Sequence, residues 1–318
     1  MSSTVRLIAW IEPGQEELIR DAVRCGGFEL AAVGSYDTAA GVSLSESLET
    51  NRVATLREAV LQDDAGLLWL AAGRRIEPDE RRLIREAGLL TITSEPMPGS
   101  VAEVLSDPRE AVTARFVPLM RQSPGYRAAR EVFEQFGQRQ CVNIFLGSAP
   151  GQGSLFGRLF DAMDLAQTLC GSIEMLDAAL CGEMSGVPET LGGLHGHLTL
   201  NMRFSDNRCA CAAVSDQAGG WFRAITLLGE GGCVRIEDDG FNWTAPDGHT
   251  IDSHREPQLL SPGELVAMQV RRLLDHLDAT DPPPDEAGIL TLCEAARLSC
   301  RTGQGEVPRK MLEMLRRP

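Results

Sequence analysis

The spacing of hydrophobic residues predicts alternating strands and helices over the first hundred residues. Apolar runs predict strands at residues 5–11, 28–33, 66–72 and 89–93, and amphipathic segments predict helices at 15–24, 55–62 and 78–86. The run at 66–72 is apolar throughout, which is typical of a strand that is covered on both faces. This order of elements predicts an N-terminal, Rossmann-like, doubly wound parallel sheet in an α/β fold.

The pattern changes in the second part of the chain. A strand is predicted at 142–146, and residues 197–204 alternate between apolar and polar side chains. A turn is expected at 205–207, and a solvated, acidic turn at 237–240. Amphipathic helices are predicted at 265–277 and 288–301. We therefore expect a Rossmann-like domain over residues 1–118 and an α+β domain with a mostly antiparallel sheet over 119–318. The C-terminal helix is expected to pack back on the first domain.

One predicted helix, at residues 153–171 between two glycines, is apolar over more than half of its circumference. Gly157, Asp161, Asp164 and Thr168 are spaced four, three and four residues apart and therefore share one stripe of this helix. A polar stripe on a buried helix has two interpretations. It is the solvated face of the helix, which is the commoner case, or it lines a cleft.

Composition and charge exclude several classes of partner. The 318 residues carry a formal net charge of −15, which disfavours nucleic acids and anionic membranes. No apolar run approaches the roughly 18 residues that a membrane span needs, and the N-terminus does not resemble a signal peptide. The nine cysteines are scattered, as expected of a cytoplasmic protein, and the pair Cys209 and Cys211 does not by itself specify a metal site. Lys310 is the only lysine.

Several segments, in this order, carry a resemblance to a known family: residues 28–33, 55–60, 93–96, 153–171, 228–232 and 294–304. Together they make the chain similar, over nearly its whole length, to the glucose–fructose oxidoreductase/inositol dehydrogenase (Gfo/Idh/MocA) family. The resemblance implies an enzyme that uses NAD(P) to transfer hydride to or from a sugar or cyclitol. It also implies that copies of the chain associate through the open face of the second domain's sheet.

The loop after the first strand departs from that family. The resemblance calls for a G-x-G-x-x-G turn that cradles the pyrophosphate, but residues 10–16 read Trp-Ile-Glu-Pro-Gly-Gln-Glu. Pro13 has no N–H to donate, and Gly14 is the only glycine of the loop. The acidic residue that would hold the ribose is replaced by Ser35, with Asp37 two residues later. Gly14, Ser35 and Asp37 are the candidates for cofactor binding at this end of the sheet.

Two further positions depart in the same way. Pro96 matches the proline of the family's Glu-Lys-Pro triplet, which places Glu95 on the lysine. On the glycine-bounded helix, the resemblance places Gly157 on an aspartate, Asp161 on the catalytic histidine and Asp164 on a second aspartate. Glu95, Asp161 and Asp164 are therefore the candidate catalytic residues.

Three functions remain open. The sequence favours a divergent relative without standard hydride transfer and without a cofactor, which acts as a sugar-like ligand-binding, regulatory or structural protein. Such a protein would form homo-oligomers or associate with a catalytic relative. The second possible function is that of an enzyme in which Glu95 and Asp161 perform acid–base chemistry or bind a metal with Asp164, His195 or His197. The third is an NAD(P)-dependent oxidoreductase with a divergent loop.

Overall fold

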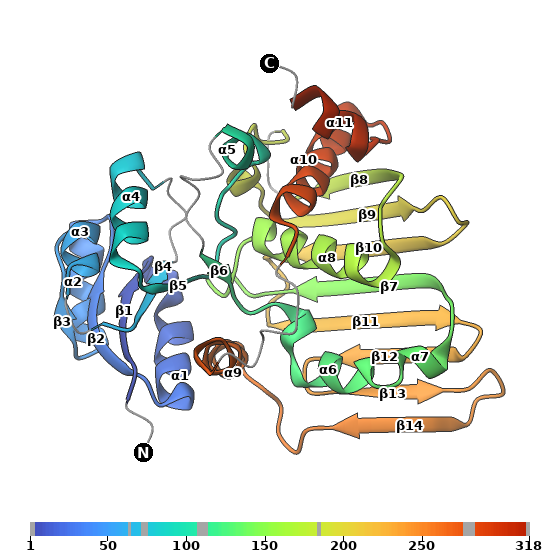
Figure 1. The fold of residues 1–318 in the computed structure, drawn as a ribbon, viewed down its shortest axis with the longest axis horizontal. Coiled ribbons are helices and arrows are strands. Elements are labelled where there is room, and N and C mark those ends of the chain that lie inside the picture. Colours follow the sequence, from blue (N-terminus) through green and yellow to red (C-terminus); the bar gives the residue numbers. More distant parts are fainter. Residues whose placement is uncertain are drawn as a thin grey trace. The chain divides into compact units, whose positions relative to one another are not determined.

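A computed structural model describes residues 4–62, 65–70, 76–106, 114–182, 186–275 and 284–315. The chain divides into two compact units, which are described separately (Figure 1). Unit 1 comprises residues 1–99, 106–118 and 261–282, and unit 2 comprises 100–105, 119–260 and 283–318. Apart from residues 100–105, the chain thus stays in unit 1 up to Pro118 and returns to it for residues 261–282.

Unit 1 contains a parallel sheet with the strand order β3-β2-β1-β4-β5-β6, as in doubly wound nucleotide-binding folds. Its strands are β1 (Arg6–Trp10), β2 (Glu29–Gly34), β3 (Asn51–Arg52), β4 (Leu67–Leu70), β5 (Leu90–Thr93) and β6 (Arg115–Phe116). Its helices are α1 (Glu16–Gly26), α2 (Thr38–Ser47), α3 (Leu56–Val60), α4 (Pro78–Ala87) and α9 (Pro262–Leu274), and the short helix η1 (Pro13–Gln15) precedes α1. The predicted parallel sheet is confirmed.

Both faces of this sheet are buried, which explains the continuous apolar runs. Leu7 and Ala9 face a core that includes α1 and α9, whereas Ile8 and Trp10 face a second core beneath α3 and α4. Ala71 and Ala72, at the end of the predicted strand 66–72, lie outside the described residues. Although α9 is distant in sequence, Arg271 ties it to α1 by donating hydrogen bonds to the carbonyl oxygens of Gly26 and Gly27 (2.5 and 3.0 Å).

Unit 2 contains an eight-stranded sheet with the order β14-β13-β12-β11-β7-β10-β9-β8. Only β7 and β10 are parallel, so the predicted, mostly antiparallel sheet is confirmed. The strands are β7 (Arg139–Gly147), β8 (Met175–Cys181), β9 (His197–Arg203), β10 (Cys209–Ser215), β11 (Phe222–Gly229), β12 (Gly232–Glu237), β13 (Gly240–Thr244) and β14 (Thr250–Arg255).

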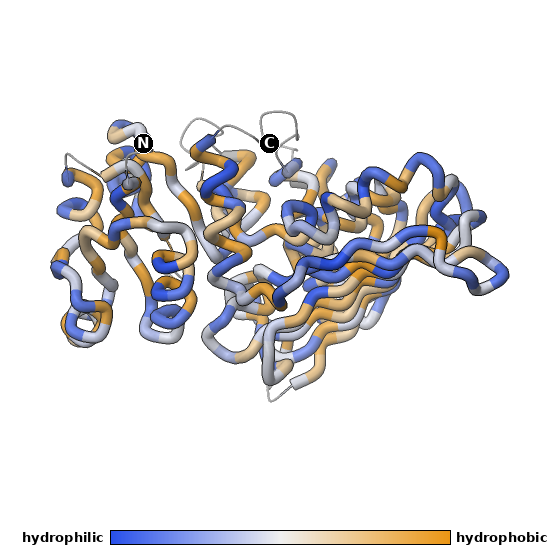
Figure 2. The backbone as a smooth tube through the Cα atoms, turned by 90° about the horizontal axis from the view of Figure 1, so that it is seen from below, coloured by the Kyte–Doolittle hydropathy of each residue, from blue (hydrophilic) through white to orange (hydrophobic). Residues whose placement is uncertain are grey.

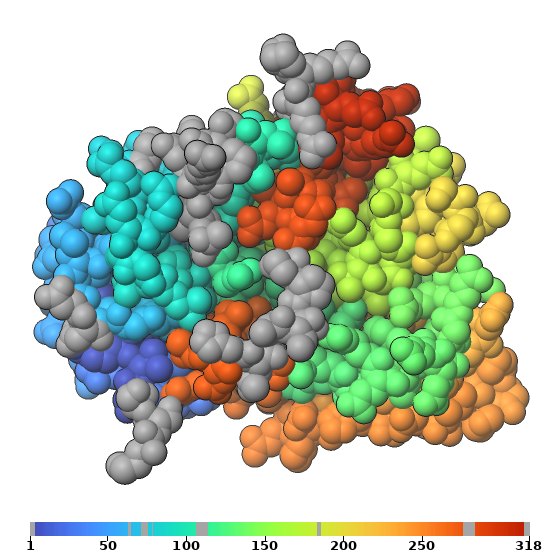
Figure 3. Space-filling model, viewed as in Figure 1, coloured from blue at the N-terminus to red at the C-terminus, as the bar shows by residue number. Residues whose placement is uncertain are grey.

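Helices cover one face of this sheet (Figures 1 and 3). The helices of unit 2 are α6 (Pro124–Arg130), α7 (Phe133–Phe136), α8 (Leu155–Cys170), α10 (Glu286–Thr302) and α11 (Pro308–Leu315), with the short helices η2 (Met120–Gln122) and η3 (Leu191–Gly193). Helix α5 (Val101–Ser106) also belongs to this unit, up to Leu105. In the part of the chain that the structure describes, the opposite face carries no helix (Figure 2). Phe145, Leu228 and Met175 lie on that open face and are 53%, 40% and 37% exposed. None of the described helices has the length and hydropathy of a membrane span.

Gly125 shows how closely the helical layer contacts the sheet of unit 2. A Cβ atom at this position of α6 would lie 2.1 Å from the carbonyl oxygen of Glu237 and 2.4 Å from the backbone nitrogen of Gly240. Both contacts are with backbone atoms, which cannot rotate away. Gly192, by contrast, has open space where its Cβ would lie.

We therefore expect Gly125→Ala to lower the free energy of unfolding by about 2 kcal/mol or more, as is usual for overpacked sites. Gly192→Ala, its matched control, leaves that free energy nearly unchanged. Urea denaturation of both variants checks this, and equal effects at the two positions would contradict the described contact of α6 with the strand ends.

Candidate functional site

The polar stripe of α8 is buried inside unit 2. Asp161 and Asp164 are 0% and 3% exposed, so the interpretation of the stripe as a solvated face is wrong, and only Thr168, one turn later, is exposed. The helix begins where the Ser154 hydroxyl accepts a hydrogen bond from the backbone N–H of Gly157 (3.0 Å). Apolar residues on the rest of the helix bury it against β7 and β10.

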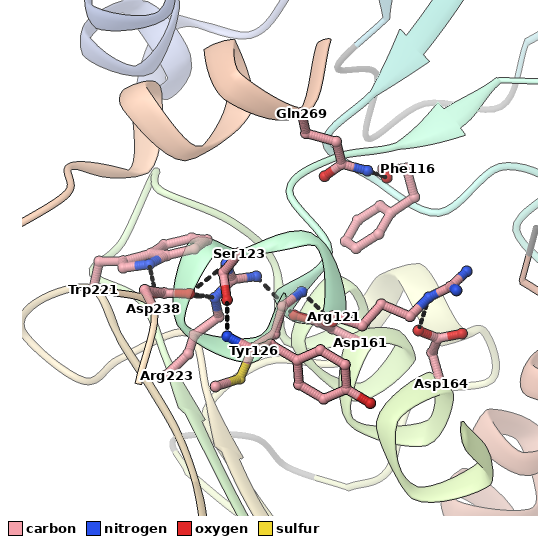
Figure 4. Close-up of polar contacts among 11 residues, drawn as sticks. Phe116, Arg121, Ser123, Tyr126, Asp161, Asp164, Trp221, Arg223, Asp238 and Gln269 are labelled. Atoms are coloured by element: carbon pink, nitrogen blue, oxygen red, sulfur yellow. Dashed lines mark hydrogen bonds and ion pairs between the residues drawn. The ribbon is translucent and has the colours of Figure 1, made fainter. Parts of the chain in front are cut away.

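Both carboxylate oxygens of Asp161 have partners within unit 2 (Figure 4). Oδ1 accepts a hydrogen bond from the backbone N–H of Met120 (2.9 Å), and Oδ2 accepts one from Nη1 of Arg223 (3.0 Å). The side chains of Asp161 and Arg223 are both 0% exposed. Charged groups buried this deeply are stable only when they are paired and hydrogen-bonded, as they are here.

Arg223, on β11, joins Asp161 to a second carboxylate. Its Nη2 and Nε atoms donate to Oδ1 of Asp238 at 2.6 and 2.9 Å. Burial opposes the charge of Arg223, but the carboxylates of Asp238 and Asp161 outweigh it, so that the pKa of Arg223 is raised. Trp221 adds to the cluster, because its indole N–H donates to Asp238 (3.0 Å) and its ring lies against the guanidinium groups of Arg223 and Arg158.

A second buried ion pair lies one turn along α8. Nε of Arg121, in η2, is 2.8 Å from Oδ2 of Asp164, and the two side chains are 9% and 4% exposed. Burial raises the pKa of Asp164 to about 7, against the opposing effect of the Arg121 guanidinium. Asp161 and Asp164 therefore hold the same short segment, Met120 and Arg121, with which the chain enters unit 2.

The sequence analysis missed the partners of the two aspartates. Asp238 was expected in a solvated turn, but Asp238 and Asp239 are only 9% and 5% exposed, so that expectation is wrong. One feature of the sequence could have indicated this buried cluster, namely the position of Arg223. It occupies an inward-facing position of a strand that alternates between buried and half-buried residues, where an arginine requires a buried acid.

The candidate cofactor-binding residues and Glu95 lie in unit 1. Asp37 caps α2, and one oxygen of its carboxylate accepts hydrogen bonds from the backbone N–H groups of Ala39 and Ala40 (2.8 and 3.2 Å). Ser35 is buried, and Gly14 is exposed within η1. Glu95 is half-buried after β5, where its backbone N–H and carbonyl both bond to the hydroxyl of Thr93.

The carboxyl end of β1, where the resemblance places the pyrophosphate, is filled by side chains. The Trp10 ring packs on Gly34 so closely that a Cβ there would lie 2.3 Å from it, and the edge of Tyr36 meets that ring at a centroid distance of 5.3 Å. The Gln15 side chain accepts from the backbone N–H of Glu12 (3.1 Å) and donates to Ser94 (3.4 Å). Glu12 and Glu16 place carboxylates around the start of α1.

Loss of the Asp161 charge tests the ion pair with Arg223. Asp161→Asn leaves Arg223 with one buried carboxylate fewer, and we expect a loss of about 3 kcal/mol in the free energy of unfolding, typical of a broken buried pair. Glu313→Gln is the control, because it removes the acid of the exposed pair with Arg309 and should change stability little. Denaturation curves of the two variants give the comparison, and a small effect of Asp161→Asn would refute the buried pair.

The raised pKa of Asp164 predicts a pH effect. Because the folded pKa of about 7 exceeds the value near 4 of an unfolded chain, the protonated form stabilises the fold at low pH, and this contribution is lost as pH rises through 7. Relative to Asp164→Asn, the unmodified chain should thus lose free energy of unfolding between pH values of about 4 and 7 and show little further change above that. All other side chains are the same in the two proteins, so a pH-independent difference in urea denaturation would contradict the pKa shift.

No protein-family model matches the chain, and no curated protein matches it in sequence. Solved structures do match its fold. Levoglucosan dehydrogenase in complex with NADH and levoglucosan has a TM-score of 0.76 and 11% identity, covering 96% of this chain and 99% of its own. An oxidoreductase from Agrobacterium radiobacter in complex with NAD+, L-tartaric acid and magnesium has a TM-score of 0.73 and 15% identity, with 98% and 100% covered.

A third structure, an NAD binding oxidoreductase from Klebsiella pneumoniae, has a TM-score of 0.69 and 12% identity, and the coverage is 96% of this chain and 99% of that one. These similarities extend over both units, and at identities of 11 to 15% they show a shared fold. The structural neighbours are Gfo/Idh/MocA-type sugar oxidoreductases, and this chain has their two-part fold.

Proposed function

We propose that this chain is a binding protein built on a sugar-dehydrogenase fold, that it holds a sugar-like ligand, and that it does not transfer hydride to or from NAD(P). The observation that carries the proposal is the state of Asp161. In the position that the resemblance gives to the catalytic histidine, this aspartate is fully buried and uses both oxygens for contacts within unit 2. A general base must reach the proton that it removes.

The carboxyl end of β1 supports the same proposal. A dinucleotide pyrophosphate needs backbone N–H groups at a glycine-rich turn and little negative charge. Here Pro13 lacks an N–H, Glu12 and Glu16 bring carboxylates, and the ring of Trp10 occupies the space above Gly34. These residues do not fit the pyrophosphate, and we derive no chemical step through NAD(P).

The ligand class follows from the structural neighbours. The complexes with this fold include levoglucosan and L-tartaric acid, which are small and rich in hydroxyl groups. This chain has the whole two-part fold, but Asp161 makes internal contacts in place of a catalytic residue. Such a protein is suited to binding these molecules without converting them. Regulation, or support of a catalytic relative, would then depend on that binding.

An NAD-dependent sugar oxidoreductase is the second candidate, and one observation favours it. The neighbours that bind NADH or NAD+ share the fold over at least 96% of this chain. This enzyme would need another residue in place of Asp161 to accept the hydroxyl proton, and Glu95 is the remaining carboxylate candidate.

The two candidates differ in turnover. Levoglucosan, L-tartrate, myo-inositol and L-sorbose are each incubated with the purified chain and NAD+ or NADP+, and nicotinamide reduction is followed by absorbance. We expect no turnover, together with a rise in melting temperature with at least one of the four compounds, because a ligand that binds only the folded chain stabilises it. Saturable nicotinamide reduction would refute the proposal and favour the oxidoreductase, and no thermal shift with any compound would refute sugar binding.

We also propose that copies of the chain associate through the open face of the eight-stranded sheet. Phe145, Leu228 and Met175 are exposed apolar side chains on that face, and burial of such side chains favours association. Phe145→Glu should convert the oligomer into a monomer in light scattering after gel filtration. Leu259→Glu, at an exposed leucine outside the sheet, should leave the oligomer intact. A monomeric unmodified chain would contradict the proposal.

A further inference from the structure

A buried aspartate supports an exposed histidine where β10 ends. Oδ2 of Asp216 lies 2.8 Å from Nδ1 of His195, and its Oδ1 accepts a hydrogen bond from the backbone N–H of Gly196 (2.8 Å). The Asp216 side chain is 8% exposed, whereas that of His195 is 56% exposed. The carboxylate is thus committed to internal contacts, and the imidazole extends from it to the surface.

The backbone that carries His195 is fixed. Leu194 and Gly196, on either side of it, are buried, and Gly196 has a φ of +102°. A Cβ on Gly196 would lie 2.5 Å from the carbonyl oxygen of Cys181, so only glycine fits there. The backbone N–H of Asp216 also donates to the carbonyl oxygen of Gly196 (3.3 Å). Both the backbone of His195 and the Nδ1 atom of its ring are therefore held in place.

The contacts also assign the proton of the neutral imidazole. Because the carboxylate of Asp216 accepts from Nδ1, the proton lies on Nδ1 and the lone pair on Nε2. The side-chain nitrogen of Gln217 lies 3.2 Å from Nε2, in the position of a donor. His195 thus presents a hydrogen-bond acceptor whose present partner is the side-chain amide of an exposed glutamine.

Two other histidines with acidic partners lack this construction. His249 pairs with Asp247, and the two side chains are 64% and 71% exposed. His254 pairs with Glu256, at 47% and 37% exposure. In both pairs the acid is two residues away along the chain and is itself exposed, which is the ordinary state of a surface histidine. Of these three histidines, only His195 has a ring that contacts a buried acid, and that acid is 21 residues away along the chain.

A six-residue connection leads from Asp216 to the start of β11. The connection from Asp216 to Trp221 is fastened to the end of β7, because the backbone N–H of Ala218 donates to the carbonyl oxygen of Ser148 (3.0 Å). The same six residues therefore supply Asp216, Gln217 and the half-buried Trp221. The connection that carries Asp216 and Gln217 is thus held in place near its middle.

We propose that His195 is a ligand-binding residue whose Nε2 atom accepts a hydrogen bond from a hydroxyl group of a polyhydroxylated ligand, with Asp216 as its positioning residue. This inference rests on the proposed function, whose sugar-like ligand it assigns to the loops at this end of the sheet. The incoming hydroxyl replaces the amide of Gln217 at Nε2. A neutral polyol fits because a hydroxyl group can donate to the acceptor that the site offers at Nε2.

Chemical footprinting of the full-length chain tests the proposal. Diethyl pyrocarbonate modifies neutral imidazole nitrogens, and mass spectrometry gives the rate at each histidine. The probes are levoglucosan, myo-inositol, L-sorbose and D-glucose. At a concentration about tenfold above half-saturation, a probe that occupies Nε2 should slow modification of His195 about tenfold. His249 and His254 serve as internal controls and should not change. Absence of selective protection by all four probes would overturn the proposal.

Two variants separate binding from folding. His195→Gln should abolish the thermal shift that the protecting polyol causes, whereas His249→Gln should keep it. Asp216→Asn should reduce the protection of His195 while circular dichroism remains that of the folded chain. An unchanged shift in His195→Gln would overturn the proposal. Failure of the proposed function is distinguishable, because nicotinamide turnover would refute that function while leaving protection of His195 as a separate result.

Discussion

The ion pair between Asp161 and Arg223 links most parts of unit 2. One end lies on α8 and the other on β11, and Arg223 extends it to Asp238 beyond β12. Asp161 also holds the backbone of Met120, at the start of the unit. Two charges in a fully buried position persist only if each has partners, so the helix, the strand and the entering segment must keep this arrangement together.

This constraint changes the meaning of the polar stripe on α8. A carboxylate that accepts a backbone N–H and a guanidinium has neither the freedom nor the exposure for proton transfer. Asp164, one turn away, is ion-paired with Arg121. The stripe on this helix therefore contributes to stability, and the ligand recognition that we propose falls to other groups, of which His195 precedes β9 in a loop.

Much of the fold followed from hydrophobic spacing, because strands such as β4 that are covered on both faces leave a continuous apolar run. The parallel sheet, the mostly antiparallel sheet and the limits of α8 were predictable for this reason. The partners of Asp161 were not, since Arg223 lies 62 residues away and periodicity carries no information about such distant pairs. Asp238 was misassigned because an acidic turn has the same composition whether it is solvated or buried against an arginine.

The chain has the fold of its structural neighbours at 11 to 15% identity, because other residues supply the packing. Packing at the end of β1 now depends on the Trp10 ring against Gly34, and η1 on hydrogen bonds of Gln15. Calorimetric titration of the full-length chain with NADH and NADPH tests this account most directly. It predicts no saturable heat up to about 1 mM, the upper end of ordinary substrate affinities. Saturable binding with a stoichiometry near one per chain would contradict it.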